Sequence, residues 1–272
     1  MTVTRNLDEA WSRLRRLYPD DTWFGGIHLE ENRPRLFQMM ADLLELLPPA
    51  TGTGSTRVVD VGCYNGFLCY LLTQFGYTTA GIDALAESAV PERTGMLKEI
   101  NAPYFEANFN ELDPFPAVPT DSFDGAILGE VFEHILTHPV GFLEAVRRIL
   151  RPGGLLILTT PNPLTLSNAI RVLRGQGTCW GDSDFAAMPK IDAAGKMISY
   201  PDIHYREYGQ RVLLEAIQKA GFEVVRAQYL GMGVSAHQAG WKRLIKSLPG
   251  WQKLQTSRLF GMSNYVVCRR PA

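Results

Sequence analysis

The feature that most constrains the fold is a regular alternation of β-branched runs with helical segments between residues 57 and 161. RVVDVG and TTAGID have the composition of buried strands, whereas FLCYLLTQFG between them has helical periodicity. Such alternation predicts an α/β, doubly wound sheet with helices on both faces and ligands beyond the carboxyl ends of its strands. The expected strands cover residues 57–62, 78–83, 103–109, 123–129 and 155–161, and the clearest helices cover 67–76 and 139–150.

The segments outside this alternation indicate the domain boundaries. Residues 1–50 are amphipathic and predict an N-terminal helical cap, clearest over 33–47, before a main domain at 51–272. Residues 163–203 are rich in glycine and predict an irregular insertion that can cover the sheet edge as a lid. The carboxyl-terminal part is expected to hold a helix over 209–221, a basic helical piece over 241–248, and two strands over 222–230 and 264–270 that form an antiparallel hairpin.

Composition excludes several classes of protein. The 272 residues are 46% hydrophobic and 20% charged, which suits one large globular domain with a cap. The net charge of −1 does not favour a nucleic-acid partner. No apolar run is long enough for a membrane span, and the first residues lack the apolar core of a secretory signal, so we expect a cytoplasmic protein. Cys63, Cys69, Cys179 and Cys268 have no C-x-x-C spacing and are expected to be reduced core thiols.

The first strand leads into a glycine-containing turn, VDVGCYNG. Gly62 and Gly66 suit a tight turn that approaches a ligand closely, but Tyr64 breaks the G-x-G-x-x-G pattern of dinucleotide sites. Asp60 precedes the turn, where an acid suits a positively charged group better than a pyrophosphate. Asp83 ends the second strand, where a carboxylate can accept both hydroxyls of a ribose. Together these residues favour an adenosine ligand without pyrophosphate.

A second cluster of ionisable residues follows the fourth strand in GEVFEHI, where Glu130, Glu133 and His134 would share one face of a helix. Three interpretations are open: His134 as a general base oriented by a glutamate, a divalent cation bound by the cluster, or a helix cap with no chemical role. His204, in YPDIHYREYG, precedes a later helix and can reach the same edge of the sheet. His138 precedes a proline and is expected to lie in a loop.

The motifs together resemble the class I S-adenosylmethionine-dependent methyltransferases over roughly residues 40–230. VVDVGCYNG, GIDA, NFNELDPFP, SFDGAILGEVFEHI and LRPGGLLILTTPNP carry the resemblance. It implies a mostly parallel seven-stranded sheet of order 3-2-1-4-5-7-6, with the last strand antiparallel, and S-adenosyl-L-methionine as cofactor. Tyr64 stands where the family very often has glycine, which implies a narrower pocket. The implied site residues are Asp60, Gly62, Cys63 and Gly66 around the methionine end, Asp83 at the ribose, Asn108 and Phe109 at the adenine, and Gly129 and Glu130 in the methyl-transfer cleft.

E-x-x-E-H followed by a later histidine is similar to metal-dependent O-methyltransferases, among them RNA 3′-terminal 2′-O-methyltransferases, and to the O-methyltransferases of ubiquinone synthesis. In the RNA enzymes the pattern implies a cation bound by the residues that match Glu130, Glu133, His134 and His204. Relatives without a metal also have E-H, which leaves His134, assisted by Glu130 and His204, as a catalytic base. Mixed carboxylate and imidazole ligands suit Mg, Mn or Zn.

The methyl acceptor is the least constrained part. We expect a hydroxyl of a small molecule, such as a sugar, a glycan precursor or a phenol. The alternatives are a metal-dependent RNA 2′-O-methyltransferase, a non-catalytic S-adenosylmethionine-binding module, and a dehydrogenase that binds NAD. The sequence leaves the oligomeric state open.

Overall fold

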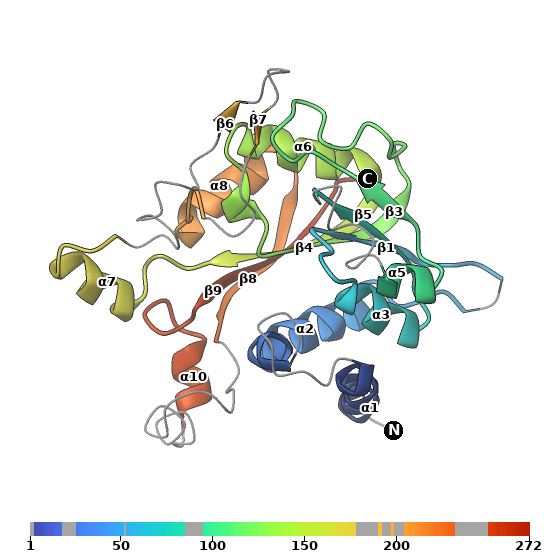
Figure 1. The fold of residues 1–272 in the computed structure, drawn as a ribbon, viewed down its shortest axis with the longest axis horizontal. Helices are drawn as coiled ribbons and strands as arrows, with labels where there is room; N and C mark the ends of the chain where they lie inside the picture. Colours follow the sequence, from blue (N-terminus) through green and yellow to red (C-terminus); the bar gives the residue numbers. More distant parts are fainter. Residues whose placement is uncertain are drawn as a thin grey trace.

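The computed structural model describes residues 3–17, 26–51, 53–84, 95–177, 190–191, 197–198, 204–231 and 250–272. At its centre lies a seven-stranded sheet (Figure 1). The strands are β1 (Arg57–Val61), β2 (Thr78–Asp83), β3 (Tyr104–Glu106), β4 (Phe123–Gly129), β5 (Leu150–Pro161), β8 (Glu223–Leu230) and β9 (Ser263–Arg269). Their order is β3-β2-β1-β4-β5-β9-β8, and β9 runs antiparallel to both of its neighbours. The predicted fold class, strand order and carboxyl-terminal hairpin are therefore confirmed.

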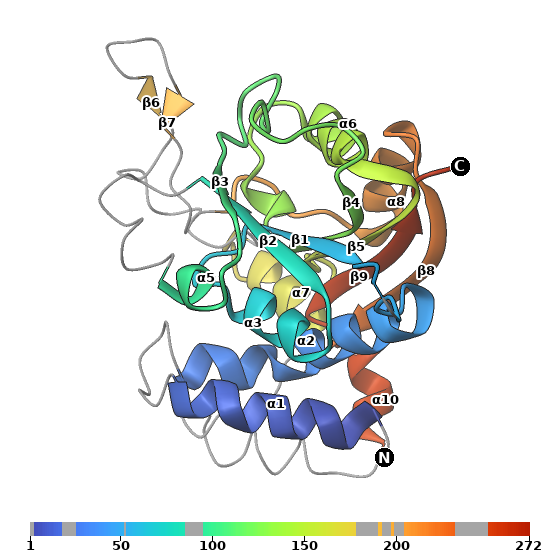
Figure 2. The same cartoon turned by 90° about the vertical axis from the view of Figure 1, so that its right-hand side faces the viewer.

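Helices cover both faces of this sheet (Figure 2). On one face lie α1 (Val3–Leu17), α2 (Gly26–Leu46) and α3 (Phe67–Gln74), and on the other lie α6 (Pro139–Ile149) and α8 (Gln210–Lys219). Each face has its own apolar core, in which the buried strand residues alternate between the two sides. The shorter elements are α5 (Gly95–Glu99), the 3₁₀ helix η1 (Phe132–His134), α7 (Leu166–Leu173), α10 (Trp251–Gln255), and a separate pair of two-residue strands, β6 (Lys190–Ile191) and β7 (Met197–Ile198).

A buried acid joins the N-terminal helices to the carboxyl-terminal hairpin. Asp42 of α2 is 1% exposed and accepts a hydrogen bond of 2.5 Å from the Tyr265 hydroxyl on β9. It also forms an ion pair with Arg226 of β8 and accepts a hydrogen bond from Gln38 at 3.2 Å. A buried carboxylate without a partner would destabilise the fold, so Asp42 must keep these contacts with β8 and β9. The contacts thereby hold α2 against the sheet. Residues 1–50 as an independent cap stay a prediction.

The structure differs from the expected elements in two places. β5 begins at Leu150 rather than near residue 155, so Pro152, Gly153 and Gly154 belong to the strand. Part of the expected irregular insertion, α7, is a regular helix whose first turn is capped by the Thr165 hydroxyl, which accepts from the Asn168 N–H at 3.2 Å. The basic segment 241–248 lies outside the described residues, as do Cys179 and most of residues 178–203.

Three of the four cysteines lie among the described residues. Cys63, Cys69 and Cys268 are buried free thiols. Over the same part of the chain, no helix combines the length and apolar character needed to cross a bilayer.

Candidate functional site

The turn after β1 has three residues in the left-handed region of backbone conformation. Gly62 and Gly66 have φ values of 80° and 75°, and Tyr64 between them has φ of 46°. This conformation costs a residue with a side chain about 1–2 kcal/mol, which explains the preference for glycine. The Tyr64 N–H donates to the Asp83 carboxylate at 2.6 Å, and the Gly62 N–H donates to the carbonyl of Ile82 at 2.7 Å. These bonds to β2 hold the turn in place even with tyrosine at its centre.

Asp60 and Asp83 lie at the carboxyl ends of neighbouring strands, as predicted. The pKa of Asp60 is raised from 3.8 to about 7: burial and, after it, the negative charge of Asp83 raise the pKa, while the positive charge of Arg35 lowers it. Asp83 also accepts from the Ala84 N–H at 2.7 Å. A buried acid that titrates near neutrality is ready to bind a positively charged ligand.

The glycine turn is in contact with the E-x-x-E-H motif. A Cβ atom at Gly62 would lie 2.1 Å from Cγ2 of Val131, the residue that precedes η1. Glycine is therefore required here both for its conformation and for the space that Val131 occupies. The two sequence motifs form one packed unit at the sheet edge.

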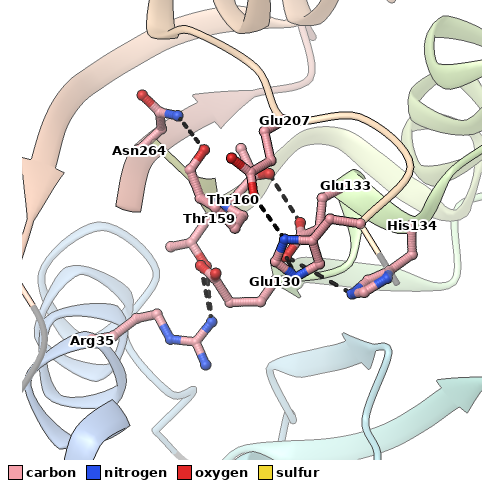
Figure 3. Close-up of polar contacts among 10 residues, drawn as sticks. Arg35, Glu130, Glu133, His134, Thr159, Thr160, Glu207 and Asn264 are labelled. Carbon is pink, nitrogen blue, oxygen red and sulfur yellow. Dashed lines mark hydrogen bonds and ion pairs between the residues drawn. The ribbon is translucent and has the colours of Figure 1, made fainter. Parts of the chain in front are cut away.

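The E-x-x-E-H motif does not form the expected helical face. Glu130 has φ of 58°, which prevents a helix from starting there, and its N–H donates to the Thr159 carbonyl of β5 at 3.0 Å. A single turn of 3₁₀ helix then carries Glu133 and His134. The Glu130 carboxylate lies 3.2 Å from Nη1 of Arg35, which also donates to the Thr159 hydroxyl at 3.2 Å. Glu130 therefore pairs with α2, in a direction that helical periodicity did not predict (Figure 3).

Glu133 is completely buried at the centre of the site. Its Oε2 accepts from the Thr160 hydroxyl at 2.9 Å, and its backbone carbonyl accepts from the N–H groups of Tyr205 and Arg206 at 3.0 and 3.2 Å. Its Oε1 is buried without a hydrogen-bond partner. Burial, and then the charge of Glu130, raise the pKa of Glu133 well above its usual value. Oε1 of Glu130 is likewise buried without a hydrogen-bond partner, although it forms the ion pair with Arg35. Buried polar atoms without a partner are rare, so this part of the structure suits a bound ligand.

Two histidines face that oxygen. Oε1 of Glu133 lies 3.9 Å from Nε2 of His134 and 4.0 Å from Nε2 of His204. The two rings meet edge to face, with centroids 5.0 Å apart. One oxygen of Glu133 and one nitrogen of each histidine lie within 4.8 Å of one another, so three members of the predicted cation-binding set come together. The fourth, Glu130, is the residue that pairs with Arg35.

Glu207 and Arg35 belong to this site and were not among the predicted site residues. Oε1 of Glu207 lies 2.9 Å from Nδ1 of His204, and the Glu207 side chain is only 6% exposed. A carboxylate there accepts the Nδ1 proton and leaves Nε2 of His204 directed at Glu133. The spacing of Glu207, three residues after His204, could have suggested this pair. No local pattern marks Arg35, because it comes from the N-terminal helices.

The residues expected at the adenine have other contacts in the structure. The Asn108 side chain donates to Glu111 at 2.9 Å and accepts from the Asn110 N–H at 3.2 Å, as in a turn. The Phe109 ring is buried and packs edge to face against Phe115 and Phe142. Contact of either residue with adenine stays a prediction.

Two further residues of the sequence analysis lie near the end of β4 and at the start of α6. Gly129 ends β4 beside Met39 and Arg35. His138 is the N-cap of α6 and lies outside the helix, as expected.

The fold and these motifs agree with the comparison to known families. A family model described as a methyltransferase domain matches residues 29–227, which is most of the chain. The chain belongs to the class I S-adenosylmethionine-dependent methyltransferases. Solved methyltransferases from Mesorhizobium loti and Archaeoglobus fulgidus have the same fold, with TM-scores of 0.52 for both and sequence identities of 18% and 17%. These alignments cover 90% and 89% of this methyltransferase, and 100% and 99% of the solved chains.

Curated relatives are similar over a shorter stretch. The mitochondrial ubiquinone biosynthesis O-methyltransferase of Mus musculus is 27% identical over 126 residues, which is 46% of this chain and 34% of the mouse protein. The ubiquinone biosynthesis O-methyltransferase of Xanthomonas oryzae is 30% identical over 118 residues, 43% of this chain and 48% of that protein. The alignments thus span about a third to a half of the length of these relatives.

S-adenosylmethionine, the cofactor of this family, fits the turn after β1. Its amino-acid end carries a positive ammonium group, and the buried Asp60 offers a carboxylate whose ionisation such a charge would favour. Contact of Asp83, at the end of β2, with the ribose stays a prediction. The left-handed turn at Gly62–Gly66 allows the backbone to approach the ligand closely.

Two glycine substitutions would test the contact between the turn and Val131. Gly62→Ala is expected to lower the free energy of unfolding by about 2–4 kcal/mol, since it adds overpacking to the cost of left-handed alanine. Gly153→Ala is the matched control, because Gly153 has φ of 78° but no atom within 4 Å of the added Cβ. It should cost about 1 kcal/mol. Equal losses in urea unfolding would contradict the proposed steric contact.

The raised pKa of Asp60 has a consequence for stability that can be measured. The unfolded carboxyl titrates near 3.9 and the folded one near 7, so the folded state binds the extra proton between these values. The protonated Asp60 therefore contributes to the free energy of unfolding below about pH 4, and this contribution is lost as the pH rises to about 7. The loss is roughly 3–5 kcal/mol for a fully buried group. Asp60→Asn should flatten that decline in urea unfolding of the cofactor-free protein. The exposed control Asp113→Asn should leave it unchanged, and an unchanged decline in Asp60→Asn would show that Asp60 is not its source.

Proposed function

We propose that this protein transfers the methyl group of S-adenosylmethionine to a hydroxyl oxygen of a small molecule, at a site where Glu133, His134 and His204 bind a divalent cation. One observation carries the proposal: the buried Oε1 of Glu133 has no hydrogen-bond partner and faces Nε2 of both histidines. The names of the curated relatives, which are O-methyltransferases, support the choice of oxygen as the acceptor.

The acceptor chemistry explains why such a cluster is useful. The sulfonium of the cofactor is already a strong electrophile, so carbon and amine acceptors mainly need alignment. A hydroxyl acceptor also needs its proton removed or its pKa lowered. A bound divalent cation supplies that Lewis acidity. The residues of the chain would hold the cation, orient the acceptor oxygen and exclude water around the buried Glu133.

The distances show that neither histidine is hydrogen-bonded to Glu133. Separations of 3.9 and 4.0 Å are longer than hydrogen bonds, which span roughly 2.7–3.2 Å. A cation bound about 2.1 Å from each ligand would hold neighbouring ligand atoms roughly 3.0–3.4 Å apart, so its binding would draw these side chains closer by up to about 1 Å. The carboxylate of Glu207 behind His204 is a further arrangement typical of metal-binding histidines. In this proposal Glu130 lines the cleft and pairs with Arg35, rather than acting as a fourth ligand.

The acceptor is proposed to be a phenol, a sugar or a glycan precursor. This rests on the net charge of −1, which gives no broad attraction to RNA, and on the relatives named for ubiquinone biosynthesis. A lid over the acceptor, formed by residues 163–203 after β5, stays a prediction.

A pair of histidine substitutions would test the site. His134→Ala should weaken binding of Mn²⁺ to the chelator-treated protein at least tenfold, because it removes one of three ligands, while S-adenosylmethionine affinity changes less than threefold. His138→Ala, four residues later at the start of α6, should change neither. Calorimetric titration measures both affinities, and a panel of phenols and sugars with labelled cofactor measures turnover.

The outcomes separate the competing interpretations. Turnover that a chelator abolishes and one added cation restores would support the metal site. Loss of turnover in His134→Ala without any cation binding to the wild type would replace the metal by a general base. Normal turnover in His134→Ala would exclude both roles. Cofactor binding with no turnover of any acceptor, unaffected by His134→Ala, would instead indicate a non-catalytic binding module.

A further inference from the structure

An unusually apolar part of the surface lies on α7 and on the segment that precedes β9. α7 has no buried residue, and Leu173 at its end is 87% exposed. Monomeric proteins rarely expose so many large apolar side chains in two adjoining segments, and such surfaces usually bind a partner. We call this set the α7 surface; it comprises Leu164, Leu166, Ile170, Val172, Leu173, Leu254, Leu259 and Met262, each between 41% and 87% exposed.

Backbone hydrogen bonds join the two segments of the α7 surface. The Leu166 N–H donates to the Leu259 carbonyl at 2.8 Å, and the Asn162 N–H donates to the Met262 carbonyl at 2.8 Å. The buried Asn162 side chain donates to the carbonyls of Arg258 and Gly261, both at 2.8 Å. Figure 1 shows α7 and α10 extending beyond the same end of the sheet. The apolar side chains are therefore presented by one connected structure.

The charge of these segments is one-sided. Residues 162–177 and 250–262 contain Arg171, Arg174, Lys253 and Arg258 but no aspartate or glutamate, in a chain whose net charge is −1. Glu215, which lines a groove beside Leu164 and Arg258, is paired with Arg211 at 3.2 Å. The α7 surface therefore combines exposed apolar side chains with a local excess of positive charge.

We propose that the α7 surface binds peripherally to lipid bilayers with anionic headgroups. An amphipathic helix with leucine and isoleucine on one side and arginine beside them suits the boundary between headgroups and acyl chains. Basic residues near the bilayer add electrostatic attraction that falls with salt. The surface follows β5 directly, and β5 ends with Thr159 and Thr160 in the candidate site. The proposal does not depend on the identity of the methyl acceptor.

Vesicle sedimentation with the full chain tests this proposal. The protein should sediment with vesicles of mixed phosphatidylglycerol and phosphatidylcholine, and binding should fall at high salt and with phosphatidylcholine alone. Leu173→Glu should weaken partitioning at least tenfold, since it removes an inserted apolar group and adds a repelled charge. Arg174→Gln and Lys253→Gln should each weaken it about fivefold on the anionic vesicles.

A matched control lies elsewhere on the surface. Leu112 is 84% exposed, almost as much as Leu173, but is not part of the α7 surface, so Leu112→Glu should change partitioning less than twofold. All substituted side chains are exposed, and thermal unfolding checks that each variant is folded. Failure of the wild type to sediment, or equal losses in Leu112→Glu and Leu173→Glu, would overturn the proposal. A wild-type dimer that Leu173→Glu dissociates, without vesicle binding, would overturn it in favour of contact between two copies of the chain.

Discussion

The buried carboxylate of Glu133 is the constraint on which the site depends. A carboxylate at zero exposure needs stabilisation from neighbouring polar groups, and burial raises the pKa of Glu133 well above its usual value. The Thr160 hydroxyl donates to one carboxylate oxygen of Glu133, and the backbone carbonyl of Glu133 accepts from the N–H groups of Tyr205 and Arg206. These bonds join the end of β4, the end of β5 and the segment before α8. They also bring His204 next to His134 and leave one oxygen available.

The pKa values of two buried acids at the carboxyl edge of the sheet are raised for the same two reasons. Asp60 and Glu133 are both buried, and each lies near a second carboxylate, Asp83 for Asp60 and Glu130 for Glu133. Arg35, reaching across from α2, partly offsets this repulsion at both residues. The ligands proposed for the two positions, an ammonium group with its neighbouring sulfonium and a divalent cation, are all positively charged. Binding would therefore relieve unfavourable burial of charge that the folded chain otherwise retains.

The fold was largely predictable because its signals are local. Alternating strand and helix patterns placed all seven strands, and the glycines of the turn after β1 adopt the conformation for which glycine is preferred. Helical periodicity was misleading at Glu130, where a hydrogen bond to β5 and a left-handed backbone replace the expected helix. The helix α7 was not predicted, because it has no buried side chain and lies between segments that contain glycine and proline.

The sequence by itself determined where the seven strands and the main helices form, their order along the chain, and which ionisable residues stand at the ends of strands. Those properties follow from local composition and from the geometry of parallel sheets. Only the tertiary structure decided that His204, paired with Glu207, lies beside Glu133, and that Arg35 forms an ion pair with Glu130. These partners lie far apart in the chain. Their meeting depends on strand register and on hydrogen bonds across the sheet edge, about which no local pattern carries information.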